Sequence, residues 1–381
     1  MNIKDVRVHL IQAPLDTPFC FSQGWVKNRS SVIVEVICED GESGFGECMC
    51  HGQQPPHLAA AFIENCYRPR MIGRDIFDVE VIWEELYNTS RPFGQQGAAI
   101  NALSGVDIAL WDAIGRHLGK PVSKLIGGNF RDRVRAYATG FYRVRDGVYP
   151  DDAIREAQSY IERGFTGMKL KTGFGPDNDI AYIRAVREAI GPDKLLMADF
   201  NCAYNQAAAR RILLSLQDVH LEFFEELLAP EDIRGYAAIR NLTDSYLAAG
   251  ENLFGKATYT SWLEAGALDI YQPDLCSNGG FTELKKLAAL TQAYNTMMIP
   301  HVWGSGVGLA ASLQFIASLP PTPLSYTPIE PMLEYDQSSH PFRLDLIYDG
   351  IVFKDGFVHV PTAPGIGVEI NREILKRYAI R

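Results

Sequence analysis

Charged and polar residues recur at a nearly constant interval through the second part of the chain, and this interval restricts the possible fold more than any other feature. One strand with its following helix occupies about 30 residues. The residues at this interval, 23 to 28 positions apart, are Lys171, Asp199, Glu225, Glu251, Asp274 and His301. The spacing therefore predicts successive strand–helix units in which each polar side chain lies at the carboxyl end of a strand.

The segments that carry these residues alternate between strand and helix patterns. Eight strand-like pieces run from RAYATGF at 135–141 to MLEYD at 332–336, with helical stretches such as NDIAYIRAVREAIG at 178–191 between them. Eight strands separated by helices are typical of a TIM barrel, whose active site lies at the carboxyl ends of its strands. We therefore expect an α/β fold with a catalytic barrel over residues 131–354.

The first 130 residues follow a different pattern. VRVHLIQAPL at 6–15, SVIVEVICED at 31–40 and GFGECMC at 44–50 read as three strands joined by turns. Residues 99–118 then place apolar side chains on one helical stripe. Strands followed by helices indicate an α+β domain over residues 1–130. The tail, about residues 355–381, reads as strand and turn, and we expect it to return to this first domain.

Composition excludes several classes of protein. The 381 residues suit two domains, and a formal net charge of −10 argues against a nucleic-acid-binding protein, which is usually basic. No apolar run reaches the length of a membrane span, and the first residues lack the apolar core of a signal peptide. Seven cysteines without regular spacing indicate reduced thiols. These features predict a cytoplasmic protein that binds neither nucleic acid nor membrane.

A short Cys-x-Cys-His cluster raises the alternative of a zinc site. It consists of Cys48, Cys50 and His51. Structural zinc sites usually need a second pair of ligands at a defined spacing, and none accompanies this cluster. A zinc site here is therefore not favoured.

Three of the regularly spaced residues are carboxylates. Asp199, Glu225 and Glu251 would converge at the ends of three consecutive strands, where they repel one another unless a cation binds between them. Hard oxygen ligands that leave room for water or substrate suit Mg²⁺. The alternative is that these acidic residues only face solvent at the rim of the barrel, which is the more common case for a single residue at a strand end. Glu226 would point to the other side of its strand, and Asn201 would face the substrate.

Two further pairs indicate proton transfer. Lys169 and Lys171 lie two residues apart, so both side chains point into the barrel, where the ammonium group of Lys169 and the metal would lower the pKa of Lys171. Asp274 would orient His301 across the site, although a histidine alone is more often structural. We expect Lys171 to be a base, Lys169 to face the bound carboxylate, and the site to remove a proton beside a carboxylate, leading to racemisation or β-elimination.

These motifs together resemble the mandelate racemase subgroup of the enolase superfamily. The motifs are KLK at 169–171, DFN at 199–201, FEE at 224–226, GEN at 250–252, QPD at 272–274, PH at 300–301, MLEYD at 332–336, ALSGVDIALWD at 102–112 and PGIGVEI at 364–370. The resemblance implies an N-terminal α+β capping domain over a modified (β/α)₇β barrel, one Mg²⁺ per subunit, and a homo-oligomer, either an octamer or a dimer. It also implies that Glu334 binds the substrate carboxylate, with Glu330 as the alternative.

Within the subgroup, QPDLCSNGGFTELKKLA, PHVWGSGVGLAASLQF and IEPMLEYDQSSHPFR look most like the lactone cycloisomerases. The resemblance implies ring opening of an aldaric acid lactone, such as galactarolactone, to a keto-deoxy acid, with Lys171 or His301 as the base. Dehydration of an open-chain sugar acid or epimerisation is the alternative within the family. A Schiff-base aldolase or a non-catalytic binding protein is the alternative outside it. The loops at 17–30 and 48–57 would set specificity, with Trp25, Lys27 and Arg29 as candidate substrate contacts.

Overall fold

Three antiparallel strands form the N-terminal sheet of the chain, which is described here from a computed structural model covering residues 1–322, 325–348 and 350–380. They are β1 (Ile3–Phe21), β2 (Gly24–Cys38) and β3 (Ser43–Met49), in the order β1-β2-β3. Alternation along β2 sends Val32, Val34 and Val36 to the face that packs on helices of this part of the chain. The predicted three strands are confirmed.

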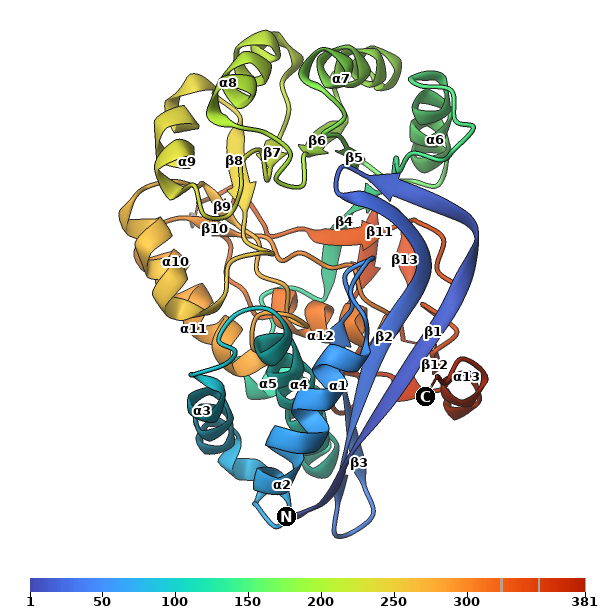
Figure 1. Cartoon of the computed structure of the whole chain (residues 1–381), viewed down its shortest axis with the longest axis vertical. Coiled ribbons are helices and arrows are strands. Elements are labelled where there is room, and N and C mark those ends of the chain that lie inside the picture. The colour runs from blue at the N-terminus through green and yellow to red at the C-terminus, as the bar shows by residue number, and fades with distance from the viewer. Residues whose placement is uncertain (323–324, 349, 381) are drawn as a thin grey trace.

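Helices cover one face of this sheet (Figure 1). They are α1 (His57–Phe62), α2 (Arg68–Met71), α3 (Val79–Ser90), α4 (Ala98–Leu118) and α5 (Val122–Leu125). Helix α4 corresponds to the stripe predicted over 99–118. It approaches β3 closely because Gly46 faces it: a Cβ at Gly46 would lie 2.1 Å from the carbonyl oxygen of Gly105. A side chain there would push the helix off the sheet.

Eight parallel strands and seven helices follow in strict alternation and form the barrel (Figure 1). The strands are β4 (Arg133–Thr139), β5 (Gly167–Lys171), β6 (Leu195–Asp199), β7 (Phe223–Glu225), β8 (Tyr246–Ala249), β9 (Ile270–Tyr271), β10 (Met297–Met298) and β11 (Leu333–Asp336). The helices are α6 (Asp151–Glu162), α7 (Pro176–Ile190), α8 (Gln206–Ser215), α9 (Ile233–Ile239), α10 (Gly255–Glu264), α11 (Gly280–Ala293) and α12 (Gly306–Ala317). The last strand, β11, pairs with the first, β4. The predicted (β/α)₇β barrel with an N-terminal cap is therefore confirmed.

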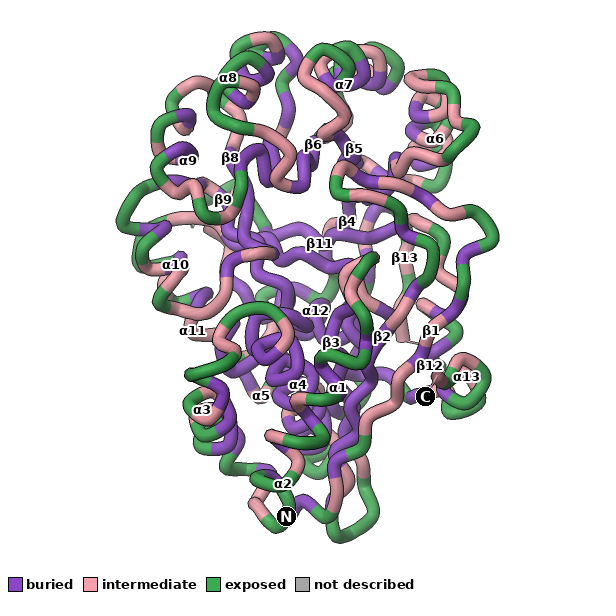
Figure 2. Tube along the Cα trace, viewed as in Figure 1, coloured by how far each residue is buried: buried purple, intermediate pink, exposed green. Residues whose placement is uncertain are grey.

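The barrel interior has an apolar layer below a charged one. Met197 and Phe223 belong to the inner core cluster, and Asp199 and Glu225 follow them by two residues on the same strands. The period of two places each carboxylate on the inward face, above its apolar neighbour. Figure 2 shows that the barrel strands are mostly buried. Helices such as α7 and α8 are exposed on their outer sides, whereas α12 is buried all round.

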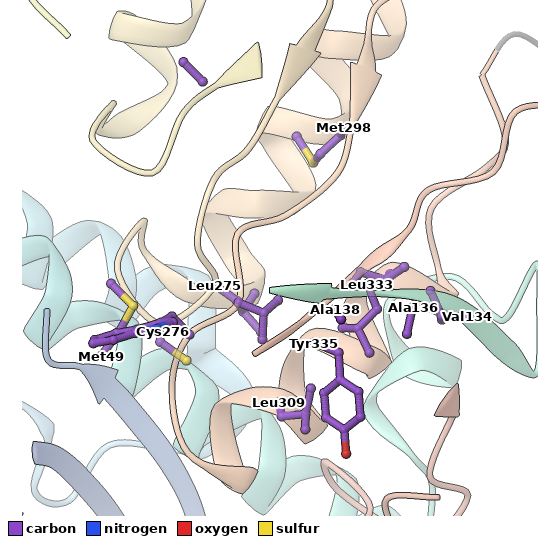
Figure 3. Close-up of a cluster of buried hydrophobic side chains, with 14 of the residues drawn as sticks. Met49, Val134, Ala136, Ala138, Leu275, Cys276, Met298, Leu309, Leu333 and Tyr335 are labelled. Atoms are coloured by element: carbon purple, nitrogen blue, oxygen red, sulfur yellow. The ribbon is translucent and has the colours of Figure 1, made fainter. Parts of the chain in front are cut away.

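Outward-facing side chains of the strands pack against the helices. In Figure 3, Leu333 and Tyr335 of β11 and Ala138 of β4 lie near Leu309 of α12. Because the strands are buried on both faces, most of their residues are apolar, as expected for a parallel sheet, and several of the charged ones, such as Lys169, Lys171, Asp199 and Glu225, belong to the charged layer.

The C-terminal segment contacts both parts of the molecule. Its elements are β12 (Ile347–Tyr348), β13 (Phe353–Lys354), β14 (Phe357–His359), β15 (Glu369–Ile370) and α13 (Arg372–Arg377). Strand β14 pairs with the barrel strand β4, while beyond α13 the amide of Ile380 donates to the carbonyl oxygen of Leu10 at 2.9 Å. The end of the tail therefore returns to the N-terminal sheet, and the amide of Ile366 also donates to Asp112 of α4 at 2.7 Å. Residues 357–359 extend the barrel sheet instead. The domain limits 1–130, 131–354 and 355–381 remain a prediction.

The turn between β1 and β2 lies against the carboxyl end of β6. Ser22 Oγ donates to the carbonyl oxygen of Phe200 at 3.1 Å, and the Gln23 amide donates to that of Asn201 at 2.6 Å. The N-terminal sheet therefore reaches over the mouth of the barrel. None of the described helices is long and apolar enough to cross a membrane.

Candidate active site

The strand register brings the regularly spaced residues together. Asp199 is paired in register with Lys171 on one side and with Glu225 on the other. Glu251, Asp274 and His301 follow the ends of the next three strands by two or three residues. All of them are at most 5% exposed. The arrangement is the one that the spacing of these residues predicts.

Lys171 is bound by a carboxylate. Its Nζ forms a short ion pair with Asp199 and lies 3.4 Å from the Asn201 side-chain oxygen. Burial would lower the pKa of Lys171, but the Asp199 carboxylate outweighs burial, so this pKa is raised. The expected lowering of this pKa by Lys169 and a bound metal stays a prediction, since the Asp199 carboxylate here pairs with Lys171 itself.

Lys169 lies deeper in the barrel than the pocket. Its Nζ is 2.6 Å from Glu225 Oε1 and 2.8 Å from Glu334 Oε1, and the side chain is fully buried. The other oxygen of Glu225 accepts from Gln272 at 2.8 Å. Glu334 therefore lies within the site, whereas the alternative, Glu330, is exposed and pairs with Arg131.

His301 lies between two carboxylates. Its Nδ1 is 2.7 Å from Asp274 Oδ2, as predicted for an orienting pair. Its Nε2 is 3.0 Å from Glu251 Oε2. Burial opposes protonation of His301, but the Glu251, Glu334 and Asp274 carboxylates outweigh it and raise its pKa to about 10.

A pocket of about 270 Å³ opens onto these groups. It is lined by Phe21, His51, Tyr142, Lys171, Asn201, Glu251, His301 and Trp303. Lys171 and His301 thus face the same space from different strands, with Glu251 beside them. An adjoining, more open hollow of about 700 Å³ shares Phe21, His51, Asn201 and Glu251. Lys171 and His301 are thus both accessible from one concave, partly apolar space, as is usual for small-molecule sites.

The structure does not bring the three predicted specificity residues into this pocket. Trp25 and Lys27 line two other hollows, which share no residue with this pocket. Arg29 is 2% exposed and stacks on the Trp303 ring, where it donates to Asp336 at 3.2 Å. The alternation along β2 could not indicate this, because the bend at the tip of the hairpin decides which side chains reach the barrel.

Sequence analysis did not single out four of the lining residues, namely Phe21, His51, Tyr142 and Trp303. Phe21 and His51 nevertheless lie in the two loops, 17–30 and 48–57, that were expected to set specificity. The Nε2 atom of His51 lies 3.3 Å from Glu251 Oε1, whereas Cys48 and Cys50 are buried in the N-terminal core. The position of Trp303 two residues after His301 was the available signal, since residues that follow barrel strands line the mouth.

The buried charges favour a cation. Six buried carboxyl groups, Asp199, Glu225, Glu226, Glu251, Asp274 and Glu334, face only three buried bases, Lys169, Lys171 and His301. Burial raises the pKa of the Glu225 carboxyl group to about 7, although the ammonium group of Lys169 acts in the opposite direction. One oxygen of Glu226 is buried without a hydrogen-bond partner. In the structure these carboxylates pair with neighbouring ammonium, imidazole and amide groups. Among residues 1–322, 325–348 and 350–380, no three acidic, imidazole or thiol groups lie close enough together to form a metal-binding cluster. The donor chemistry, hard oxygens on adjacent strands with excess negative charge, fits Mg²⁺.

Comparison with known proteins gives the same family over nearly the whole chain. Residues 3–127 match the N-terminal domain of mandelate racemase and muconate lactonizing enzyme, and residues 152–374 match the enolase C-terminal domain-like family. The chain is 42% identical to D-galactarolactone cycloisomerase from Agrobacterium fabrum over 99% of both chains. It is 32% identical to D-gluconate dehydratase from Thermoproteus tenax over 91% of this chain and 69% of that protein.

Solved structures agree. The 3,6-anhydro-D-galactonate cycloisomerase from Zobellia galactanivorans superimposes with a TM-score of 0.89 and 32% identity over 100% of both chains. A racemase from Streptomyces coelicolor, determined with bound magnesium, has a TM-score of 0.88 and 28% identity over 99% of this chain and 100% of that one. The resemblance stated from the motifs is confirmed: the chain belongs to the mandelate racemase and muconate lactonizing enzyme family of the enolase superfamily.

Proposed function

We propose that this protein is a Mg²⁺-dependent enzyme that removes the proton α to the carboxylate of a sugar acid and expels the oxygen at the β-carbon. The observation that carries the proposal is that Lys171 and His301 line one pocket beside a buried, negatively charged cluster. Opening of an aldaric acid lactone to a keto-deoxy acid is the favoured reaction. Its support is the 42% identity to a lactone cycloisomerase over the full chain.

Asp199, Glu225 and Glu251 would hold one Mg²⁺ per subunit. Bound there, Mg²⁺ would supply positive charge beside the substrate carboxylate as that group gains electron density. Lys169 and Glu334, which contact each other at 2.8 Å, would bind the inner end of the substrate. Asn201, which lines the pocket, would orient it.

The residues of the chain perform the proton transfers. Lys171 or His301 takes the proton from Cα, and Asp274 keeps the imidazole of His301 oriented throughout. The electron pair of the C–H bond forms the double bond between Cα and Cβ, and the ring oxygen leaves Cβ with its electron pair. The resulting enol is protonated at Cβ, for which the second group of the pair is positioned, and the product is a 2-keto acid.

Dehydration of an open-chain sugar acid is the second candidate, because sugar-acid dehydratases are also similar over most of this chain. It uses the same steps with a hydroxyl group as the leaving group. The cytoplasmic location and the homo-oligomer, octamer or dimer, remain predictions.

A screen of aldonic acids, aldaric acids and their lactones tests the proposal. Keto-acid formation from a lactone supports ring opening, keto-acid formation only from open-chain acids supports dehydration, and deuterium exchange at Cα without a keto acid supports epimerisation. Activity should vanish with EDTA and return with Mg²⁺ or Mn²⁺. Full activity after exhaustive chelation would contradict the role of the metal.

A further inference from the structure

Tyr142 places a hydroxyl group at the pocket beside the proton-transfer groups. It follows strand β4 and lines the pocket together with Lys171 and His301. Its ring centre is 4.4 Å from that of Phe19 and 5.6 Å from Lys171 Nζ. The ring is therefore held by the N-terminal part of the chain on one side and faces the barrel site on the other.

The proton of this hydroxyl group is free for a ligand. Trp303 Nε1 donates to the Tyr142 hydroxyl at 2.8 Å. An indole N–H can only donate, so the tyrosine oxygen is the acceptor in this bond and its own proton must point elsewhere. In the part of the chain that the structure describes, no hydrogen bond leads from this hydroxyl group to a protein acceptor. Burial raises the pKa of Tyr142, so the hydroxyl group keeps its proton.

Arg29 fixes the indole that orients this hydroxyl group. Its guanidinium carbon lies 3.6 Å from the centre of the Trp303 ring. It also donates to the Trp303 carbonyl oxygen at 3.1 Å and to Asp336 Oδ2 at 3.2 Å. Both of these bonds come from Nη2, and Nη1 donates to the Ser338 hydroxyl group at 3.4 Å. The planar guanidinium is thus fixed while it stacks on the indole. The contacts run from Arg29 through Trp303 to Tyr142.

We propose that the Tyr142 hydroxyl group is a substrate-binding donor to an ether, carbonyl or hydroxyl oxygen of the sugar acid beyond its reacting carboxylate. Arg29 is then a positioning residue that acts through Trp303. The identity of the ligand rests on the proposed function, whereas the direction of the hydrogen bond rests on the donor chemistry of Trp303. A buried donor aimed at one oxygen discriminates strongly against analogues that lack this oxygen.

A double-mutant cycle tests the contact between Trp303 and Tyr142. The Tyr142→Phe variant should lose about 10- to 100-fold in kcat/KM, and Trp303→Phe should lose less, since the hydroxyl group remains but is no longer oriented. The combined variant should lose clearly less than the product of the two single losses, because both changes act on one hydrogen bond. Losses that simply multiply, or a Tyr142→Phe variant equal to wild type, would overturn the proposal. Tyr294→Phe, at a half-exposed surface position, is the matched control.

Deoxy analogues separate a binding role from a merely structural one. We expect this result for the deoxy analogue that lacks the oxygen bound by Tyr142. It should bind wild type as weakly as the intact substrate binds the Tyr142→Phe variant, and it should bind wild type and the variant with equal affinity. Calorimetry in a Lys171→Ala background measures this affinity without turnover. The opposite result would be that the Lys171→Ala protein binds the substrate but that Tyr142→Phe lowers the affinity for every deoxy analogue as well. The hydroxyl group would then not recognise a substrate oxygen. If wild type neither binds nor converts any sugar acid, the proposed function itself fails, and the Tyr142 proposal fails with it.

Discussion

At the scale of single residues, each of the two groups proposed to transfer protons is paired with a carboxylate that also favours its charged form. Asp199 keeps the Lys171 ammonium group in place, and Asp274 holds Nδ1 of His301. Raised pKa values of both bases mean that both are protonated when the carboxylates face them. Before either base can accept a substrate proton, the carboxylate that pairs with it must bind another cation. The Mg²⁺ of the proposed function would be such a cation.

Removal of either base should abolish turnover but have opposite effects on isotope exchange. We expect Lys171→Ala and His301→Asn each to lose about 10³-fold in kcat. In D₂O, the variant that lacks the group taking the proton should also lose exchange at Cα, whereas the other should retain it. NMR of the recovered substrate measures this exchange. A rate close to wild type in either variant would contradict the two-base mechanism.

Asp274→Asn should keep the fold but weaken the orientation of His301. An amide can still hydrogen-bond to Nδ1, but it does not stabilise the imidazolium, so we expect a loss of about 10- to 100-fold in kcat with little change in KM. Steady-state kinetics measures the split. A large increase in KM with unchanged kcat would instead indicate that Asp274 acts in binding.

At the scale of elements, strand β3 and helix α12 are joined by one buried carboxylate. Glu47 of β3 accepts hydrogen bonds from the backbone amides of Ser305 and Gly308 and from the side chain of Ser31. Ser305 is the N-cap residue of α12 and lies four residues after His301. The N-terminal sheet therefore supplies the negative group that the start of this barrel helix needs.

Glu47→Ala should destabilise the protein by about 3 kcal/mol, because several buried donors lose their acceptor. Chemical denaturation measures the loss, with Glu188→Ala on the exposed side of α7 as the control, which should change stability by about 0.5 kcal/mol or less. Equal stability of the two variants would show that the interface does not depend on this carboxylate.

The order of the barrel elements was predictable because it depends on local patterns of period two and on a repeated spacing. Lys169 and Lys171 point inward for the same reason, and so do Asp199 and Glu225. The contacts of the hairpin were not predictable, because they depend on how two separately formed layers meet. Arg29 therefore stacks behind Trp303 instead of facing the substrate, and His51 reaches Glu251 from a loop without any periodic pattern.

At the scale of the whole molecule, the last helix is tied to the first sheet by a charged pair. Arg372 of α13 lies 2.7 Å from Glu35 of β2, which also accepts from His9. Burial would raise the pKa of Glu35, but these two partners outweigh burial and lower it to about 2 from its usual 4.5. The pair thus links residues at opposite ends of the chain.

Glu35→Gln should reduce stability in a pH-dependent manner. Because the folded pKa is below the unfolded one, the contribution of the carboxylate is complete above pH 4.5 and is lost as the pH falls towards 2. We expect a loss on the order of 2 kcal/mol near neutral pH, reduced by the exposure of Arg372, and a smaller difference at pH 3. Thermal unfolding of wild type, Glu35→Gln and the exposed control Glu373→Gln measures this. A difference that does not depend on pH would exclude the ion pair as its cause.

Magnesium should stabilise the whole protein and not only its activity. At about 100 times its dissociation constant, a ligand that binds only the folded state contributes about 2.7 kcal/mol. The midpoint of thermal unfolding should therefore rise with Mg²⁺ in wild type and remain unchanged in Glu251→Gln. An equal rise in both proteins would place the ion elsewhere.

The turn between β1 and β2 is attached to the barrel by few bonds. Ser22 and Gln23 hold the carbonyl oxygens of Phe200 and Asn201, and these carbonyl groups belong to the segment that follows Asp199. Phe21, which precedes this turn, lines the pocket. We therefore expect that weakening the attachment of the turn, for example by Ser22→Ala, changes the rate at which a ligand exchanges with the pocket.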